Sequence, residues 1–124
     1  MAERLYTPAE ANQLLPEVRV VVERVQRTQR ALTDDKSVAA AREKAASNGG
    51  GHPSRELGEL TRALERDLKQ LKAWGIVLRD PTVGLIDFFS EREGEPVFLC
   101  WKIGEPRVEW WHPVQTGIAG RKKL

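Results

Sequence analysis

Three side chains in the C-terminal half of the chain have the chemistry of transition-metal ligands. Asp87 offers a carboxylate, Cys100 a thiolate and His112 an imidazole. A mixed set of this kind suits zinc or iron. The expected strand register places Asp87 beside Cys100, and the third ligand stays open between Glu105, Glu109 and His112. We expect no cofactor as the simplest case, with zinc or iron at this metal or small-ligand site as the alternative.

Asp87 is the one acid within an otherwise apolar segment. An unpaired carboxylate in a protein core costs several kcal/mol, so this residue needs a partner. One interpretation is structural, with the carboxylate accepting hydrogen bonds from the backbone or from tryptophan and arginine side chains. The other makes it a metal ligand together with Cys100.

Catalysis by Cys100 is the weaker interpretation of the only cysteine. A lone cysteine is most often a small buried apolar residue, and no histidine is placed in the sequence to activate it. A single cysteine also excludes an internal disulfide and a multi-cysteine zinc site within one chain. We therefore assign no catalytic residues and lean against an enzyme.

The charge composition indicates no polyanionic partner. Twenty lysines and arginines nearly balance 18 acids, and the net charge of +2 is too small to attract nucleic acid over a distance. Weak nucleic-acid binding is an alternative. It would use the basic tail at Arg121, exposed aromatic residues on which nucleobases could stack, and four basic residues of the second helix: Arg62, Arg66, Lys69 and Lys72. Acidic residues are interleaved with these four, which is typical of a solvated helix face. The chain has neither a membrane-spanning apolar run nor a secretion signal, so we expect a cytoplasmic protein.

Two amphipathic helices are predicted in the first part of the chain. Residues 7–10, Thr-Pro-Ala-Glu, form a capping box that starts a helix over 7–33, which Pro16 should bend without ending. Regularly spaced leucines predict a second helix over 54–74, with Gly75 as its left-handed C-cap. Helices of similar length joined in this way pack as an antiparallel hairpin.

Residues 34–53 are predicted to be a flexible connection. The stretch ends in a glycine run, Gly49 to Gly51, which offers no side chains to anchor it, so we expect residues 47–53 to be mobile. His52 fits a solvated loop residue better than a ligand, because no second ligand stands near it at metal spacing.

After Gly75 the apolar residues recur at every second position, which is the spacing of a β-strand. This pattern predicts an antiparallel β-meander over residues 76–113, followed by a tail over 114–124. The expected strands are 76–79, 85–89, 97–103 and 108–112. The fold class is therefore α+β: one domain over 1–124, with a helical hairpin packed on a short meander of three to four strands.

Turns centred on Glu93-Gly94 and Glu105-Pro106 define an expected register. In this register Phe88 of the second expected strand lies opposite Leu99 of the third, and Leu99 lies opposite His112 of the fourth. One position along, Asp87 lies opposite Cys100, and Cys100 lies opposite Trp111. Lys102 of the third strand lies opposite Glu109 of the fourth. This register places His112 on the opposite face from Asp87 and Cys100, unless His112 comes from a second subunit or the strand end twists away.

Three aromatic residues, Phe89, Phe98 and Trp111, then share the sheet face that does not pack on the helices. Aromatic area of this size on a small domain usually marks a partner surface. The economical interpretation is a homodimer, and the expected function is a cytosolic interaction or self-association module.

The sequence resembles the bacterial domain-of-unknown-function family 2203. The resemblance rests on Gly84 to Phe88, Leu99-Cys100-Trp101 with Gly104-Glu105, Trp110-Trp111-His112, Gly117 through Arg121, and Thr7 to Pro16. Only residues 34–53 fall outside it. The family is uncharacterised, so the resemblance implies a bacterial-type cytosolic domain and no particular activity.

Overall fold

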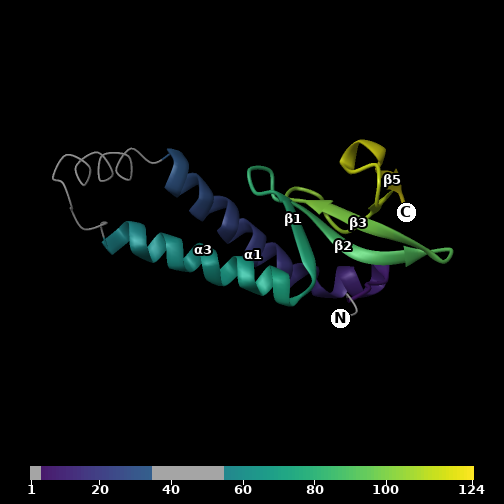
Figure 1. Cartoon of the computed structure of the whole chain (residues 1–124), viewed down its shortest axis with the longest axis horizontal. Coiled ribbons are helices and arrows are strands. Elements are labelled where there is room, and N and C mark those ends of the chain that lie inside the picture. Colours follow the sequence, from purple (N-terminus) through teal and green to yellow (C-terminus); the bar gives the residue numbers. More distant parts are fainter. Residues whose placement is uncertain (1–3, 35–54) are drawn as a thin grey trace.

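The computed structural model describes residues 4–34 and 55–124 and shows two helices packed on a five-stranded antiparallel sheet (Figure 1). The strands follow one another in sequence order across the sheet. The elements are α1 (Pro8–Asp34), α3 (Arg55–Ala73), β1 (Ile76–Asp80), β2 (Leu85–Arg92), β3 (Glu95–Lys102), β4 (Trp110–Pro113), the 3-10 helix η1 (Ile118–Gly120) and β5 (Lys122–Lys123).

The predicted α+β class with a helical hairpin is confirmed, but the sheet has five strands instead of three to four. The additional strand, β5, lies in the expected tail, where Lys122 pairs with Trp111 and Lys123 with Trp110. Two consecutive lysines carry no apolar alternation, so nothing in their pattern predicts a strand. The expected connection begins with Asp34, which is the last residue of α1, and the rest of it, 35–53, lies outside the described residues.

Both helix ends that the sequence predicted from local signals are formed. The Thr7 backbone N–H donates to Glu10 Oε1 at 2.9 Å, and the Glu10 N–H donates to Thr7 Oγ1 at 3.1 Å, which completes the capping box. Gly75 ends α3 with φ of 75° and donates its N–H to the Lys72 carbonyl. The first helix continues through Pro16.

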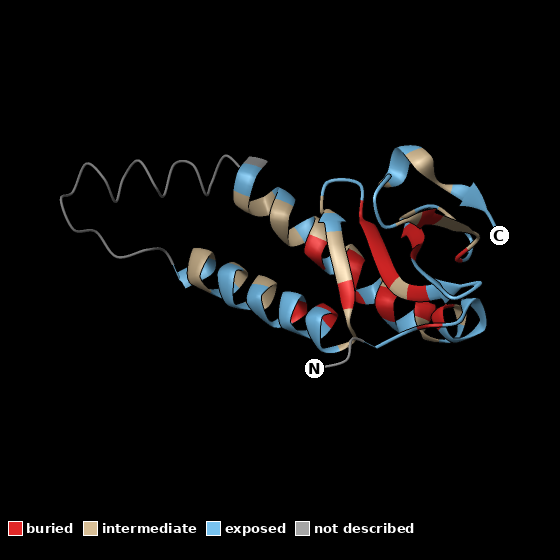
Figure 2. Ribbon diagram, turned by 45° about the vertical axis from the view of Figure 1, so that its right-hand side comes forward, coloured by how far each residue is buried: buried red, intermediate tan, exposed pale blue. Residues whose placement is uncertain are grey.

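The core lies between the hairpin and one face of the sheet (Figure 2). Val18 and Val22 of α1 pack with Phe88 of β2 and Trp101 of β3, and all four are essentially inaccessible to solvent. Neither helix within the described residues has an apolar stretch that could cross a bilayer.

Asn12 of α1 joins the helical layer to the segment just before β4 by two hydrogen bonds. Asn12 of α1 accepts from the Val108 N–H at 2.7 Å and donates to the Val108 carbonyl at 3.2 Å. Val108 itself is buried in the core just before β4 begins. The position of β4 is therefore fixed by a helix nearly a hundred residues earlier in the chain.

Candidate metal centre

Strand register decides which side chains meet on the outer face of the sheet. The expected pairings of Asp87 with Cys100 and of Phe88 with Leu99 are confirmed. The expected pairing of β3 with β4 is wrong by one residue: Leu99 faces Trp111 and Cys100 faces Trp110. Because side chains alternate along a strand, this shift carries every β4 side chain to the other face.

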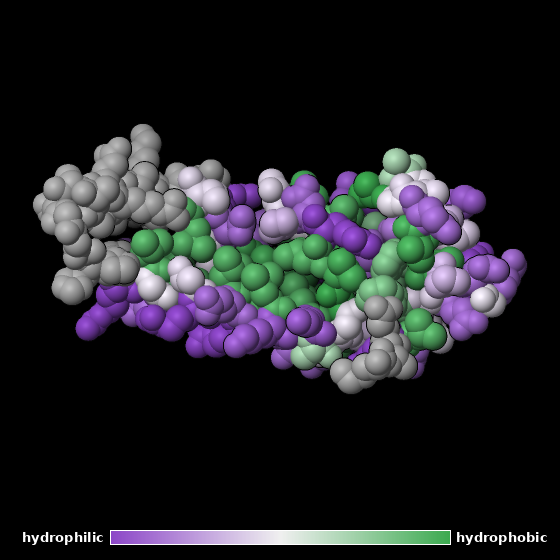
Figure 3. Space-filling model, viewed as in Figure 1, coloured by the Kyte–Doolittle hydropathy of each residue, from purple (hydrophilic) through white to green (hydrophobic). Residues whose placement is uncertain are grey.

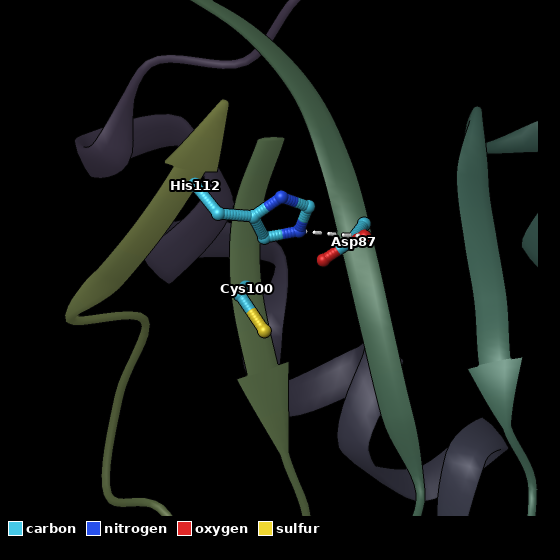
Figure 4. Close-up of side chains that lie close together, drawn as sticks. All are labelled: Asp87, Cys100 and His112. Carbon is cyan, nitrogen blue, oxygen red and sulfur yellow. Dashed lines mark hydrogen bonds and ion pairs between the residues drawn. The ribbon is translucent and has the colours of Figure 1, made fainter. Parts of the chain in front are cut away.

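The corrected register brings His112 onto the same face as Asp87 and Cys100. One ligand atom from each residue lies within 4.8 Å of the others, and the three come from β4, β2 and β3 (Figure 4). All three side chains point away from the helices, yet each residue is at most 1% exposed. The sequence placed His112 on the wrong face, and the structure makes it part of the cluster.

The two ring nitrogens of His112 both face oxygen atoms. Nδ1 lies 2.8 Å from the Pro113 carbonyl, and Nε2 lies 3.0 Å from Asp87 Oδ2. A backbone carbonyl only accepts, so Nδ1–H donates to it, and Nε2 is the nitrogen that faces the carboxylate. This arrangement orients the ring so that Nε2 is the nitrogen offered to an ion in the cluster.

The carboxylate of Asp87 has one oxygen in use and one free. Oδ2 accepts from His112 and from Arg79 Nε, which lies 2.8 Å away. Oδ1 is buried and has no hydrogen-bond partner among the described residues. The Cys100 thiol lies close enough to this carboxylate for a hydrogen bond to contribute to its raised pKa, but Oδ1 has no partner at ordinary hydrogen-bond distance in the described part of the chain and is the atom of the cluster best placed to bind a further ligand.

Cys100 is held as a neutral thiol. Burial, and next the neighbouring Asp87 charge, raise the pKa of the Cys100 thiol to about 12, against a smaller lowering by Arg121. A thiol with such a high pKa is not a nucleophile at neutral pH. Coordination by a divalent ion removes this proton, because metal-bound cysteine is a thiolate.

The three residues fit a zinc or ferrous ion in charge and in reach. One carboxylate and one thiolate neutralise a divalent charge. Ligand atoms of a tetrahedral zinc site, at about 2.0–2.3 Å from the ion, lie roughly 3.5 Å apart. The ligand atoms lie within 4.8 Å of one another, and the three residues would supply three of the four positions of such a site.

The two acids considered as alternative third ligands have other partners. Glu105 accepts from the Lys102 N–H and pairs with Arg121. Glu109 pairs with Lys123 at 2.6 Å and with Arg107 at 2.9 Å. The expected pair between Lys102 and Glu109 is wrong, because the ladder between β3 and β4 ends at Cys100 and Trp110 and Glu109 is paired with Lys123 and Arg107 instead.

The three aromatic residues expected to form a partner surface do not share a face. Phe89 and Phe98 pack together with ring centroids 4.8 Å apart, and Phe98 is only 5% exposed. Trp111 lies on the other face, half-buried against the core.

Arg79 is the site residue that the sequence did not reveal. It lies on β1, its guanidinium stacks 4.8 Å above the Phe98 ring, and its Nε contacts the Asp87 carboxylate. The sequence signal that could have identified Arg79 was its own charge, because it is a basic residue within a short apolar strand. Its partner depended on the pairing of β1 with β2, which is interrupted between Leu78 and Asp80.

Comparison of the chain with known families gives one match. The model of a family described as uncharacterized conserved protein (DUF2203) covers residues 4–124. The chain belongs to the DUF2203 family. Neither the curated proteins nor the solved structures contain a match to this DUF2203 protein. The expected family is thereby confirmed, and any function must be argued from the site itself.

Proposed function

We propose that this DUF2203 protein binds one divalent transition-metal ion, zinc in the first place and ferrous iron as the alternative, through Asp87, Cys100 and His112. The observation that carries the proposal is the buried, unpartnered Oδ1 of Asp87 inside a cluster of three different metal-ligand types. Cys100 Sγ, His112 Nε2 and the Asp87 carboxylate oxygens are the donor atoms.

The role of the ion is structural. The three ligands lie on three adjacent strands, and all three are buried. An ion there links β2, β3 and β4 across the outer face, opposite the helices. Binding to the folded state alone adds about 2.7 kcal/mol of stability when free metal is 100 times Kd.

The test is metal analysis combined with thermal unfolding. We expect purified protein to carry near-stoichiometric zinc or iron by plasma mass spectrometry. Chelation should lower Tm by roughly 10 °C, and added zinc should restore it. Asp87→Asn and Cys100→Ser should lose the ion, because an amide and a hydroxyl are poor ligands for it.

A matched control separates a lost ligand from a lost ion pair. Asp67 of α3 is also buried and paired with an arginine, Arg24 at 2.8 Å, but it belongs to the helical hairpin. Asp67→Asn should be destabilised and keep full metal content. Wild-type protein that takes up no zinc or iron after reconstitution would show that Asp87 and His112 are only a structural pair.

A second candidate function is self-association through the helical hairpin. Apolar side chains gather between the two helices (Figure 3), where a groove of about 710 Å³ has Val21 and Trp74 among its lining residues and Val20 is 52% exposed. The aromatic surface first expected to carry the dimer is not assembled, so this groove is the better surface for a second copy.

A further inference from the structure

The buried Asp87 carboxylate is paired with a cation that reaches solvent. The Arg79 side chain is 43% exposed, while that of Asp87 is only 2% exposed. The guanidinium is held in place from two directions: Nε donates to Asp87 Oδ2 at 2.8 Å, and the ring of Phe98 lies 4.8 Å from Cζ. Arg79 therefore lies between the buried ligand cluster and the surface.

We propose that Arg79 lowers the metal affinity of this site and slows the entry of the ion. The inference rests on the proposed metal-binding function and identifies the residue that regulates it. Arg79 is a positioning residue, because it acts on the ion through Asp87 and is not itself a ligand.

The physical reason is competition for one oxygen atom. His112 Nε2 and Arg79 Nε both contact Oδ2, so an ion bound between Nε2 and the carboxylate lies within a few ångströms of the guanidinium charge. Either Arg79 gives up its ion pair or the two positive charges stay close together. At an effective dielectric near 20, with further screening because Arg79 is partly exposed, the repulsion corresponds to roughly a 10- to 100-fold loss of affinity.

The opposite role is the alternative to be tested. Hydrogen bonds from outer residues often orient a carboxylate ligand and strengthen metal binding. If Arg79 acts in that way, its removal weakens binding. The two roles therefore predict changes of opposite sign in the same dissociation constant.

The experiment measures zinc affinity by competition with a chromophoric chelator and the association rate by stopped flow, using the full chain. Arg79→Gln removes the charge and keeps a donor for Asp87. Arg79→Met removes both and keeps the apolar contact with Phe98. Arg92→Gln is the matched control, because Arg92 also stacks on an aromatic ring, that of Trp111 at 4.7 Å, but contacts none of the three ligands.

We expect Kd for zinc to fall 10- to 100-fold in Arg79→Gln, with faster association, and to change less than twofold in Arg92→Gln. If the Arg79→Met variant folds, its zinc affinity and association rate should change as those of Arg79→Gln do. If Arg79→Met does not fold, the result for Arg79→Gln alone tests the inference. Unchanged or weaker binding in Arg79→Gln overturns the inference while leaving the metal site intact. Absence of zinc binding in wild type and Arg79→Gln alike overturns the metal-binding function itself.

Discussion

A buried carboxylate is tolerated in this sheet because two donors converge on one of its oxygens. Arg79 and His112 both contact Asp87 Oδ2, and only Arg79 reaches solvent. Burying an unpaired carboxylate would cost several kcal/mol, so the structural interpretation and the metal interpretation of Asp87 share the same first requirement. They differ in the role of Oδ1, which the ion pair leaves without a partner.

The titration of Cys100 gives a prediction for alkaline pH. Because its pKa is raised from 9.0 to about 12 in the folded protein, folding favours the thiol form. This contribution to stability is complete below about pH 9 and is lost as the pH rises toward 12, since the unfolded chain releases the proton first. The stability of wild type relative to Cys100→Ala should fall by about 1.4 kcal/mol per pH unit in that window.

Urea unfolding of both proteins with chelator present, at pH 7.5, 9.5 and 10.5, measures this difference. Other groups that titrate in the same range, including Tyr6, cancel in the comparison of wild type with Cys100→Ala. A difference that stays constant across the three pH values would show that the thiol is not held in its protonated form by the fold.

At the scale of elements, the turn between β1 and β2 determines how closely the sheet approaches α1. The Thr82 N–H donates to Asp80 Oδ1 at 2.9 Å, and the chain then enters β2 through Gly84 with φ of 65°. A Cβ atom at Gly84 would lie 2.4 Å from the Ile103 side chain and 3.1 Å from Val22 of α1. Glycine is therefore needed there both for its backbone conformation and for its size.

Gly84→Ala tests this close approach, and Gly94→Ala is the control. Gly94 also has a positive φ, of 80°, but a Cβ there meets nothing within 4 Å. Both variants should lose about 1–2 kcal/mol through backbone strain. Gly84→Ala should lose a further 1–3 kcal/mol through overpacking against Ile103 and Val22. Equal losses in urea unfolding would mean that Ile103 moves aside at little cost.

At the scale of the whole molecule, the sheet covers one side of the hairpin and leaves a groove along another. The Arg24–Asp67 ion pair joins α1 to α3 in this groove, and Val20 stands beside it with half of its surface exposed. A second copy that covers the groove would remove this apolar surface from water.

Self-association through the groove predicts a dimer by light scattering at high micromolar concentration. Val20→Glu should yield a monomer with little loss of stability, because the side chain is exposed and the introduced charge is buried only in the dimer. Val83→Glu is the control, because Val83 is 45% exposed and lies in the turn between β1 and β2, away from the groove. The Val83→Glu variant should remain a dimer. A monomeric wild type would contradict the proposed surface.

The sequence by itself determined the elements whose signals are local. The capping box at Thr7, the left-handed Gly75 and the change of apolar period after it mark helix ends and strands through residues close together in the chain. The pairing of Asp87 with Cys100 was also predictable, because the tight turn at Glu93-Gly94 fixes the register of β2 and β3.

Only the tertiary structure decided the register of β4, and with it the composition of the site. The connection between Lys102 and Trp110 is too long for turn geometry to set the pairing, and Asn12 of α1 holds Val108 by two hydrogen bonds instead. A contact between residues nearly a hundred positions apart leaves no local pattern in the sequence. A slip of one residue moves a side chain to the other face of a sheet, and this is why His112 joins Asp87 in the folded protein although the sequence placed them apart.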